Sequence, residues 1–240
     1  MSHQEIDFVA LERLRIQAEY RRREHDISRE QYAVWQPAEI LARAGMKRTA
    51  ATLLHRAAAF PAVGQQCLEI GFGGLGWLGD LISWGIRETD IHGIELDKVR
   101  ADRARKCLPQ ADLRNGDASS LPWLDNSFQL VILSTVLSSI LNNDVRILVA
   151  SEATRVIAPG GVLLWYDFAF NNPRNPNVRK IDRWELKQLF PRLSGEIKAI
   201  TLAPPIARFV APRSWWLAAF LESIPLCRTH LLAVLKKDHD

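Results

Sequence analysis

Short apolar runs of β-strand type alternate with helical patterns between residues 65 and 167. The run at residues 128–133 is continuously apolar at its end, as expected for a strand that is buried on both faces. Strands that are joined through helices by short links form parallel sheets with right-handed crossovers. The pattern therefore predicts a doubly wound α/β fold. Strands are expected at residues 67–70, 91–94, 112–114, 128–133 and 162–166, and helices at residues 77–84, 98–108 and 145–157, the last one stopped by Pro159-Gly160-Gly161.

The segments on either side of this alternation have different patterns. Residues 2–60 are predicted to be helical only, since Leu11, Leu14 and Ala18 recur at helical spacing. Pro37 suits the first turn of a second helix. We therefore expect a helical N-terminal extension (a lid or cap) over residues 1–60 and one α/β domain over residues 61–240. The C-terminal part is expected to contain a polar loop at 171–177, a helix at 182–190, a strand at 197–202, a proline-rich loop, an apolar helix at 215–223 and a last strand at 231–235.

The composition excludes several classes of protein. The 240-residue chain is 48% hydrophobic and 24% charged, which is ordinary for a globular protein. No apolar run reaches the length of about 18–20 residues that a membrane-spanning helix needs. Residues 1–10 show no basic-then-apolar signal, so we expect no secretory peptide and a cytoplasmic location. The net charge of +4 permits an anionic substrate but predicts no nucleic-acid partner.

Cysteine and histidine usage argues against a metal site. Cys67, Cys107 and Cys227 lie far apart and form no CxxC pair, which also argues against a disulfide framework and fits a reducing compartment. The six histidines form no HxH or HxxxH pair, so no metal ion is expected.

A glycine-rich turn, EIGFGGLG at residues 69–76, stands where a predicted strand meets a predicted helix. Glycines there let the backbone approach a ligand closely, and the free amides at the helix start favour an anionic group. Gly71, Gly73 and Gly76 spell the GxGxxG of dinucleotide-binding folds, and Glu95 at the end of the second strand suits a ribose diol. These residues alone leave two cofactor types and a purely structural turn as alternatives.

Three further sequence blocks follow the glycine turn in order: NGDA at residues 115–118, LPWLDNSF at residues 121–128 and EATRVIAPGGVLL at residues 152–164. Over residues 65–167 the chain thus resembles a class I S-adenosylmethionine-dependent methyltransferase, of the type-11 group that includes the quinone-biosynthesis enzymes. The resemblance implies methyl transfer, S-adenosylmethionine as the cofactor, and a seven-stranded sheet whose last strand is antiparallel. It carries no information on the acceptor.

The resemblance also assigns roles within the glycine turn. Glu69 matches the acid near the methionine end of the cofactor, and Gly71 and Gly73 match the glycines that pass beneath it. Family members commonly have a third glycine two places after Gly73, where this chain has Leu75. The loop is therefore expected to bend differently, with Gly76 a weaker candidate for a contact.

Two acids match the family's nucleoside contacts. Glu95, with Leu96 beside it, matches the acid whose two oxygens accept both ribose hydroxyls. Asp117 matches the acid that accepts a hydrogen bond from the adenine amine, with Ala118 beside it on the backbone.

Residues at the ends of the fourth and fifth strands complete the predicted site. Ser134 and Thr135 match positions near the sulfonium centre. Asp167 ends the fifth strand at the edge where open α/β sheets bind ligands, and it is our candidate for the base that an oxygen acceptor would need. The alternative, of equal weight, is a structural carboxylate that caps nearby amides.

Two segments outside the cofactor motifs are candidates for binding the acceptor. Tyr32 and Trp35 stand three apart and are expected to share a helix face, and Arg174 lies in the polar loop after the fifth strand. Residues 171–198 carry seven basic side chains against three acidic ones. This excess suggests a small or medium acceptor that is anionic or linked to a glycan or lipid. The alternative is a solvated basic surface and a packed N-terminal helix.

The chain has eight tryptophans, which mostly stand in apolar runs and are expected in the core. Trp215 and Trp216 begin an apolar helix that offers a weak peripheral contact with a membrane, although no basic face accompanies it. Two other functions stay open: a nicotinamide-nucleotide oxidoreductase, which rests on GxGxxG alone, and a binding module without catalysis. The sequence does not indicate the oligomeric state.

Overall fold

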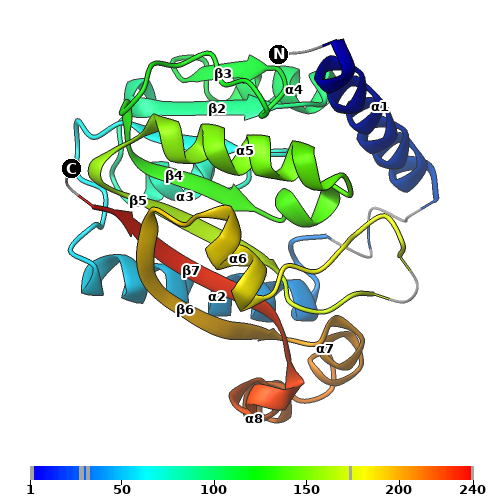
Figure 1. The fold of residues 1–240 in the computed structure, drawn as a ribbon. Coiled ribbons are helices and arrows are strands. Elements are labelled where there is room, and N and C mark those ends of the chain that lie inside the picture. The colour runs from blue at the N-terminus through cyan, green and yellow to red at the C-terminus, as the bar shows by residue number, and fades with distance from the viewer. Residues whose placement is uncertain (1–2, 27–29, 31–32, 173–174, 239–240) are drawn as a thin grey trace.

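The computed structural model describes residues 3–26, 30, 33–172 and 175–238, which contain a seven-stranded sheet (Figure 1). The strand order is β3-β2-β1-β4-β5-β7-β6, and β7 runs antiparallel to β5 and β6. The predicted doubly wound sheet with an antiparallel last strand is confirmed. The strands are β1 (Cys67–Ile70), β2 (Ile91–Glu95), β3 (Asp112–Asn115), β4 (Phe128–Ser134), β5 (Ile157–Phe168), β6 (Leu193–Leu202) and β7 (Arg228–Lys237).

Helices cover both faces of the sheet (Figure 1). Buried side chains of α5 and α6 form one hydrophobic core with the sheet, and those of α2, α3 and α4 form a second core on the opposite face. None of the helices in the described ranges is long and apolar enough to cross a lipid bilayer. The helices are α1 (His3–Asp26), α2 (Pro37–Arg56), α3 (Leu78–Ser83), α4 (Lys98–Cys107), α5 (Asn143–Val156), α6 (Arg183–Leu189), α7 (Pro204–Val210) and α8 (Trp215–Ser223), with short 3₁₀ turns η2 (Glu88–Asp90), η3 (Leu137–Ser139) and η4 (Pro225–Cys227).

The fifth strand is longer than predicted. β5 begins at Ile157, directly after α5, so the Pro-Gly-Gly segment at 159–161 lies inside the strand and is not the helix stop. The pairing of β5 with β4 shifts register between Phe128 and Leu130, and Gly160 has a φ of 73°. This irregularity accommodates the proline, which has no N–H to donate to a neighbouring strand.

A helix was missed between β6 and the apolar helix. Pro204 and Pro205 predicted a loop, but they form the first turn of α7. Proline is compatible with a first helical turn, because the N–H that it lacks would have no partner inside the helix there.

The apolar spacing in α1 predicted the helix but not the side that it buries. Leu11 and Leu14 are 57% and 56% exposed, and Ala18 is exposed as well. Val9 and Ile16 instead pack against the core that includes α5. The expectation of core tryptophans is also only partly correct: Trp77 and Trp165 are buried, whereas Trp35, Trp184, Trp215 and Trp216 are exposed.

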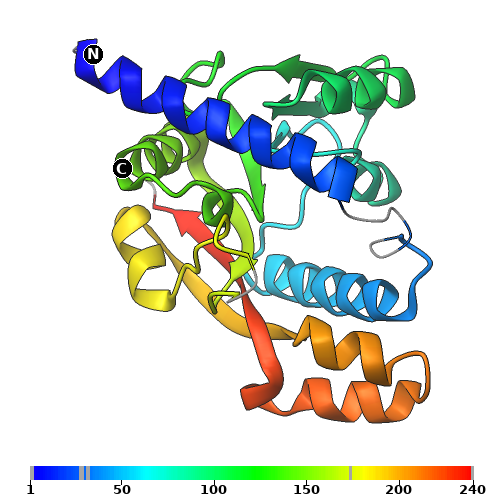
Figure 2. The ribbon, with the colours of Figure 1, turned by 90° about the vertical axis from the view of Figure 1, so that its right-hand side faces the viewer.

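α1 is attached across the edge at which the parallel strands end, as Figure 2 shows. The buried carboxylate of Glu12 accepts hydrogen bonds from the N–H groups of Leu141 and Asn142, at the start of α5, and pairs with Arg15 on its own helix. Farther along α1, Glu19 accepts a hydrogen bond of 2.8 Å from the side-chain amide of Asn177. These contacts hold α1 over the ends of β1, β2 and β4.

Candidate functional site

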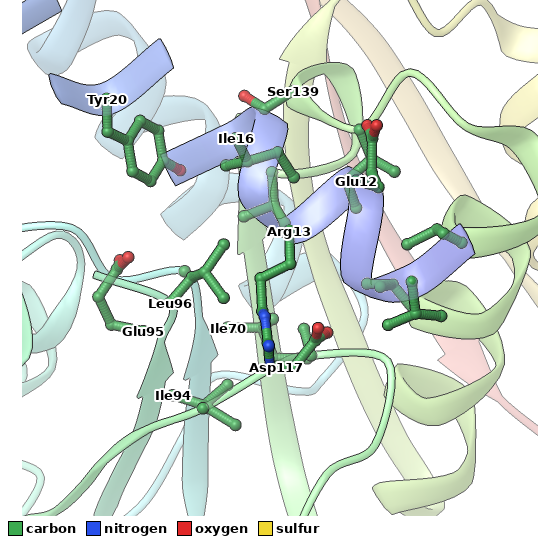
Figure 3. A pocket seen from close by; sticks show the side chains of 18 residues that line it. Glu12, Arg13, Ile16, Tyr20, Ile70, Ile94, Glu95, Leu96, Asp117 and Ser139 are labelled. Atoms are coloured by element: carbon green, nitrogen blue, oxygen red, sulfur yellow. The ribbon is translucent and has the colours of Figure 1, made fainter. Parts of the chain in front are cut away.

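A cavity lies between α1 and the carboxyl ends of β1 and β2 (Figure 3). The cavity wall includes five of the residues assigned to the cofactor, namely Gly71, Glu95, Leu96, Asp117 and Ala118. The structure therefore brings together, at one edge of the sheet, residues that are up to 47 positions apart in the sequence.

Gly71 gives the cavity its floor at the end of β1. Its φ is 72°, in the left-handed region that favours glycine. A Cβ atom at this position would lie 2.5 Å from Cγ2 of Val136, which also lines the cavity. Neither the backbone conformation nor the space accepts a side chain, so the backbone itself faces the cavity.

Glu95 connects β2 to the glycine loop. Its carboxylate accepts hydrogen bonds from the N–H groups of Gly73 (2.7 Å) and Asp97 (2.9 Å), one on each oxygen. The side chain is almost fully buried, and burial raises the pKa of Glu95. A carboxylate oxygen accepts more than one hydrogen bond, so this group fits two adjacent hydroxyls such as those of a ribose.

Asp117 lies across the cavity from Glu95, in the loop after β3. Its Oδ1 accepts a hydrogen bond of 2.8 Å from the N–H of Ser119, which fixes the side chain in the loop. The carboxylate offers only acceptors, so it fits a donor such as an exocyclic amine. Glu95 and Asp117 together fit the two polar ends of an adenosine.

α1 supplies side chains to the same cavity that the sequence motifs did not indicate. Glu12, Arg13, Ile16 and Tyr20 line it, and Figure 3 shows Arg13 extending from the helix toward Asp117. The guanidinium of Arg100 stacks 4.3 Å from the centre of the Tyr20 ring. Burial raises the pKa of the Tyr20 hydroxyl, which therefore stays protonated as a hydrogen-bond donor.

Glu69 shapes the glycine loop and does not line the cavity. Its Oε2 accepts hydrogen bonds from the N–H groups of Trp77 (2.8 Å) and Leu78 (3.0 Å), at the start of α3. Burial raises the pKa of this carboxyl to about 8. A Cβ atom at Gly76 would collide with Oε1 of Glu69. Gly76, the third glycine of GxGxxG, therefore leaves space for the Glu69 side chain, although Gly76 itself does not line the cavity.

Ser134 is the last residue of β4 and Thr135 follows it, and the next residue, Val136, lines the cavity. The N–H of Thr135 donates a hydrogen bond of 2.7 Å to the carbonyl of Tyr166, and its φ of 57° is unusual for a residue with a branched side chain. The assignment of these two residues to the sulfonium centre stays a prediction.

The geometry of Asp167 favours the structural alternative over a catalytic base. The side chain is fully buried, and it accepts hydrogen bonds from the N–H groups of Ser138 (3.0 Å) and Phe168 (2.9 Å). Burial raises the pKa of Asp167 to about 6. Because Ser138 belongs to η3, which contributes Ser139 to the cavity wall, Asp167 holds that part of the wall in place, and its role as a base stays a prediction.

Of the three residues expected to bind the acceptor, only Trp35 lies among the described residues. Tyr32 and Arg174 lie outside the described residues. Trp35 is 69% exposed and lies in a turn before α2, so the expected shared helix face is not formed at that position. In the basic segment, the Arg179 guanidinium pairs with Glu185 and the Lys180 ammonium with Asp182, which partly neutralises the local charge.

A signal in α1 would have predicted its part in the site. Val9, Ile16 and Tyr20 are spaced by seven and four residues, which places them on one helix face with Glu12 and Arg13. Charged residues interrupt this row of side chains. The spacing of Leu11 and Leu14 therefore gave the more regular apolar pattern, although those side chains are exposed. Among the described residues, no cluster of histidine, cysteine and acidic side chains is arranged to hold a metal ion.

Comparison with known proteins finds similarity to methyltransferases. Residues 68–165 match a family described as "Methyltransferase domain". A protein of Mycolicibacterium smegmatis, named "Probable S-adenosylmethionine-dependent methyltransferase", is 29% identical over 154 residues, which are 61% of this chain and 56% of that protein. The chain thus spans about half the length of this curated relative.

Solved structures share the fold at low sequence identity. The YcgJ protein from Bacillus subtilis superposes with a TM-score of 0.60 at 16% identity, covering 82% of this chain and 100% of that one. The [4+2]-cyclase SpnF superposes with a TM-score of 0.58 at 18% identity, covering 80% and 81% of the two chains. The second name shows that the fold alone does not fix the reaction.

The sheet order, the ordered motifs and the nucleoside-type cavity agree with the match over residues 68–165. Over these residues the chain is similar to S-adenosylmethionine-dependent methyltransferases.

Proposed function

We propose that this chain transfers a methyl group from S-adenosylmethionine to a small or medium acceptor that carries an anionic group or a link to a glycan or lipid. The main structural support for methyl transfer is the cavity itself. Gly71, Glu95 and Asp117 come from three successive connections of the sheet and meet beneath α1. The match over residues 68–165 supports the same reaction.

Three groups of the chain would hold the cofactor. Glu95 accepts the ribose hydroxyls, Asp117 accepts the adenine amine, and the bare backbone at Gly71 allows close approach. When bound, S-adenosylmethionine supplies an electrophilic methyl group on a positively charged sulfur. Val9 and Ile16 on α1 close the cavity with apolar surface, which excludes water and fixes the relative orientation of the reactants.

An acceptor that is already ionised suits a cavity whose described wall offers no evident general base. No histidine lines the described part of the cavity wall. The carboxylate of Glu12 is occupied by Arg15 and two backbone amides, and Asp167 is fully buried. An acceptor with a carboxylate, phosphate or phenolate nucleophile needs no base from the chain.

Exposed apolar side chains near the same edge support a lipid-linked acceptor. Val34 and Trp35, just before α2, are 59% and 69% exposed, and Phe170, just after β5, is 61% exposed. α2 begins and β5 ends at the edge where the cavity lies. An apolar portion of the acceptor would cover these side chains.

The proposal is tested by incubating the protein and methyl-labelled S-adenosylmethionine with cell extract that is separated into aqueous and lipid fractions. We expect label in an anionic or lipid-linked small molecule, and less label with Asp117→Ala, which weakens cofactor binding. Label confined to protein or nucleic acid would refute the acceptor class. Binding of S-adenosylhomocysteine without label in any fraction would indicate a binding module without catalysis.

A further inference from the structure

The connection between β6 and β7 presents large apolar side chains to solvent. It consists of α7, α8 and η4, residues 204–227, and we refer to it as the α7–α8 hairpin. Trp216 is 87% exposed, Leu226 96%, Phe209 64% and Phe220 63%. Trp216 and Phe220 are four residues apart in α8 and lie on one face of the helix.

Packing of the hairpin onto the domain does not require these side chains. The hairpin is attached through small residues, Ala207, Ala211 and Ala218, which form a buried cluster with Leu41 of α2 and Leu202 of β6. The largest side chains of the hairpin remain exposed to solvent. Monomeric soluble proteins rarely expose a contiguous apolar surface of this kind unless it binds something.

The charges on the hairpin are distributed unevenly. Arg213 is exposed, and its guanidinium stacks 4.2 Å from the centre of the Phe209 ring, within the apolar surface. Arg208 adds a second positive charge on α7. The acid of the hairpin, Glu222, is half-buried and turned toward Gly45 of α2, where its Oε1 would lie 3.0 Å from a Cβ atom at that glycine. The outward surface therefore combines aromatic and aliphatic side chains with positive charge.

The hairpin shares an edge of the sheet with the cofactor cavity. β6 runs parallel to β5, because both are antiparallel to β7, so the end of β6 at Leu202 lies on the side where β5 ends. Figure 2 shows this edge, with α1 across one part of it and α7 and α8 side by side at the other end. A surface that contacts the hairpin would therefore lie alongside the entrance to the site.

We propose that the α7–α8 hairpin docks this protein onto the surface of an anionic lipid bilayer. Tryptophan and phenylalanine partition into the boundary between headgroups and acyl chains, and guanidinium groups pair with lipid phosphates. The exposed guanidinium of Arg213 matches a negatively charged surface, whereas an apolar protein partner offers it no counter-charge. Figure 1 shows the hairpin projecting at the end of the molecule, as a surface-inserting element would.

The test uses the full chain in vesicle flotation, with phosphatidylcholine alone or mixed with phosphatidylglycerol. We expect flotation with the mixed vesicles and little with phosphatidylcholine alone. The double variant Trp216→Ser/Phe220→Ser should lower the partition coefficient at least tenfold, because each side chain loses apolar burial in the bilayer. Arg213→Glu should weaken binding to the mixed vesicles only.

A matched pair of leucine variants provides the control. Leu226→Ser lies in the hairpin, and Leu124→Ser lies before β4, at the opposite edge of the sheet, where Leu124 is 83% exposed. Leu226→Ser should lower flotation several-fold and Leu124→Ser should not. Equal effects of the two variants, or no flotation of the unmodified chain, would overturn the proposal. A shift from dimer to monomer in the Trp216→Ser/Phe220→Ser variant would also overturn it and assign the hairpin to contact between two copies. Methyl transfer does not enter this test.

Discussion

The carboxylate of Glu95 accepts a hydrogen bond of 2.7 Å from the backbone N–H of Gly73, which joins the end of β2 to the glycine loop after β1. The same carboxylate lines the cavity, as Asp117 does. One side chain therefore both shapes the loop and faces the proposed ribose position, and the two roles can be separated experimentally.

Glu95→Ala should weaken S-adenosylmethionine binding by about 1.5–3 kcal/mol, because hydrogen bonds to a charged group are lost. This corresponds to a roughly ten- to hundredfold higher dissociation constant. Glu95→Gln keeps one oxygen as an acceptor. Its dissociation constant should therefore lie between those of the unmodified protein and of Glu95→Ala. Calorimetric titration measures the constants, and an unchanged value for Glu95→Ala would refute the ribose assignment.

Substitutions at Asp117 test the adenine contact. Asp117→Ala should weaken cofactor binding, and Asp117→Asn should weaken it less, since the amide oxygen still accepts from the exocyclic amine. In Asp117→Asn only the amide oxygen can accept, so it must serve both the Ser119 N–H and the adenine amine, and both variants are compared by unfolding as well as by titration. Identical dissociation constants for the alanine and asparagine variants would contradict the contact.

Gly71→Ala tests the bare backbone beneath the cavity. The new Cβ atom meets Val136 at 2.5 Å, and the backbone φ of 72° is unfavourable for alanine. We expect a loss of about 2 kcal/mol or more in the free energy of unfolding, together with weaker cofactor binding. Gly79→Ala is the matched control, because it lies in α3 with nothing within 4 Å of its Cβ position. That variant should be neutral or stabilising by up to about 1 kcal/mol, and equal losses in both would argue against the steric explanation.

The buried carboxyl of Asp167 should make stability depend on pH in a defined direction. Its pKa is raised to about 6 from 3.8, so between these values the folded chain holds a proton that the unfolded chain has released. The free energy of unfolding therefore falls as pH rises from about 4 to 6, by about 3 kcal/mol for this group.

Asp167→Asn should remove that contribution. The difference in unfolding free energy between the unmodified chain and the variant, measured by urea titration, should decrease as pH rises from 4 to 6. His230, whose pKa burial lowers to about 4, acts in the opposite direction in the same window but is present in both proteins and cancels. A difference that is constant with pH would show that Asp167 is ionised throughout.

The sequence was informative where structure is locally encoded. The continuous apolar run at the end of β4 predicted a central strand, and the ordered glycine and acid motifs predicted Gly71, Glu95 and Asp117 on one cavity. Parallel strands bring their carboxyl ends together, so motif positions translate directly into a site.

The parts that were missed depend on long-range contacts or on context. The position of α1 over the cavity rests on Glu12, which bonds to Leu141 across 129 positions, and no local pattern indicates such a contact. The prolines at 204 and 205 indicate a break in structure locally, and only the docking of Ala207 against α2 and β6 makes them a helix start. Asp167 was placed correctly on β5, but whether it faces a ligand or backbone amides is decided by η3, which the sequence does not place.

The identity of the adenosine-containing cofactor that the cavity binds decides between methyl transfer and hydride transfer most directly. Isothermal titration of the unmodified protein with S-adenosylhomocysteine and, separately, with the oxidised and reduced nicotinamide dinucleotides answers this. We expect saturable binding of S-adenosylhomocysteine with one site per chain and no heat from either dinucleotide. Binding of a nicotinamide dinucleotide without binding of S-adenosylhomocysteine would contradict the account and support an oxidoreductase.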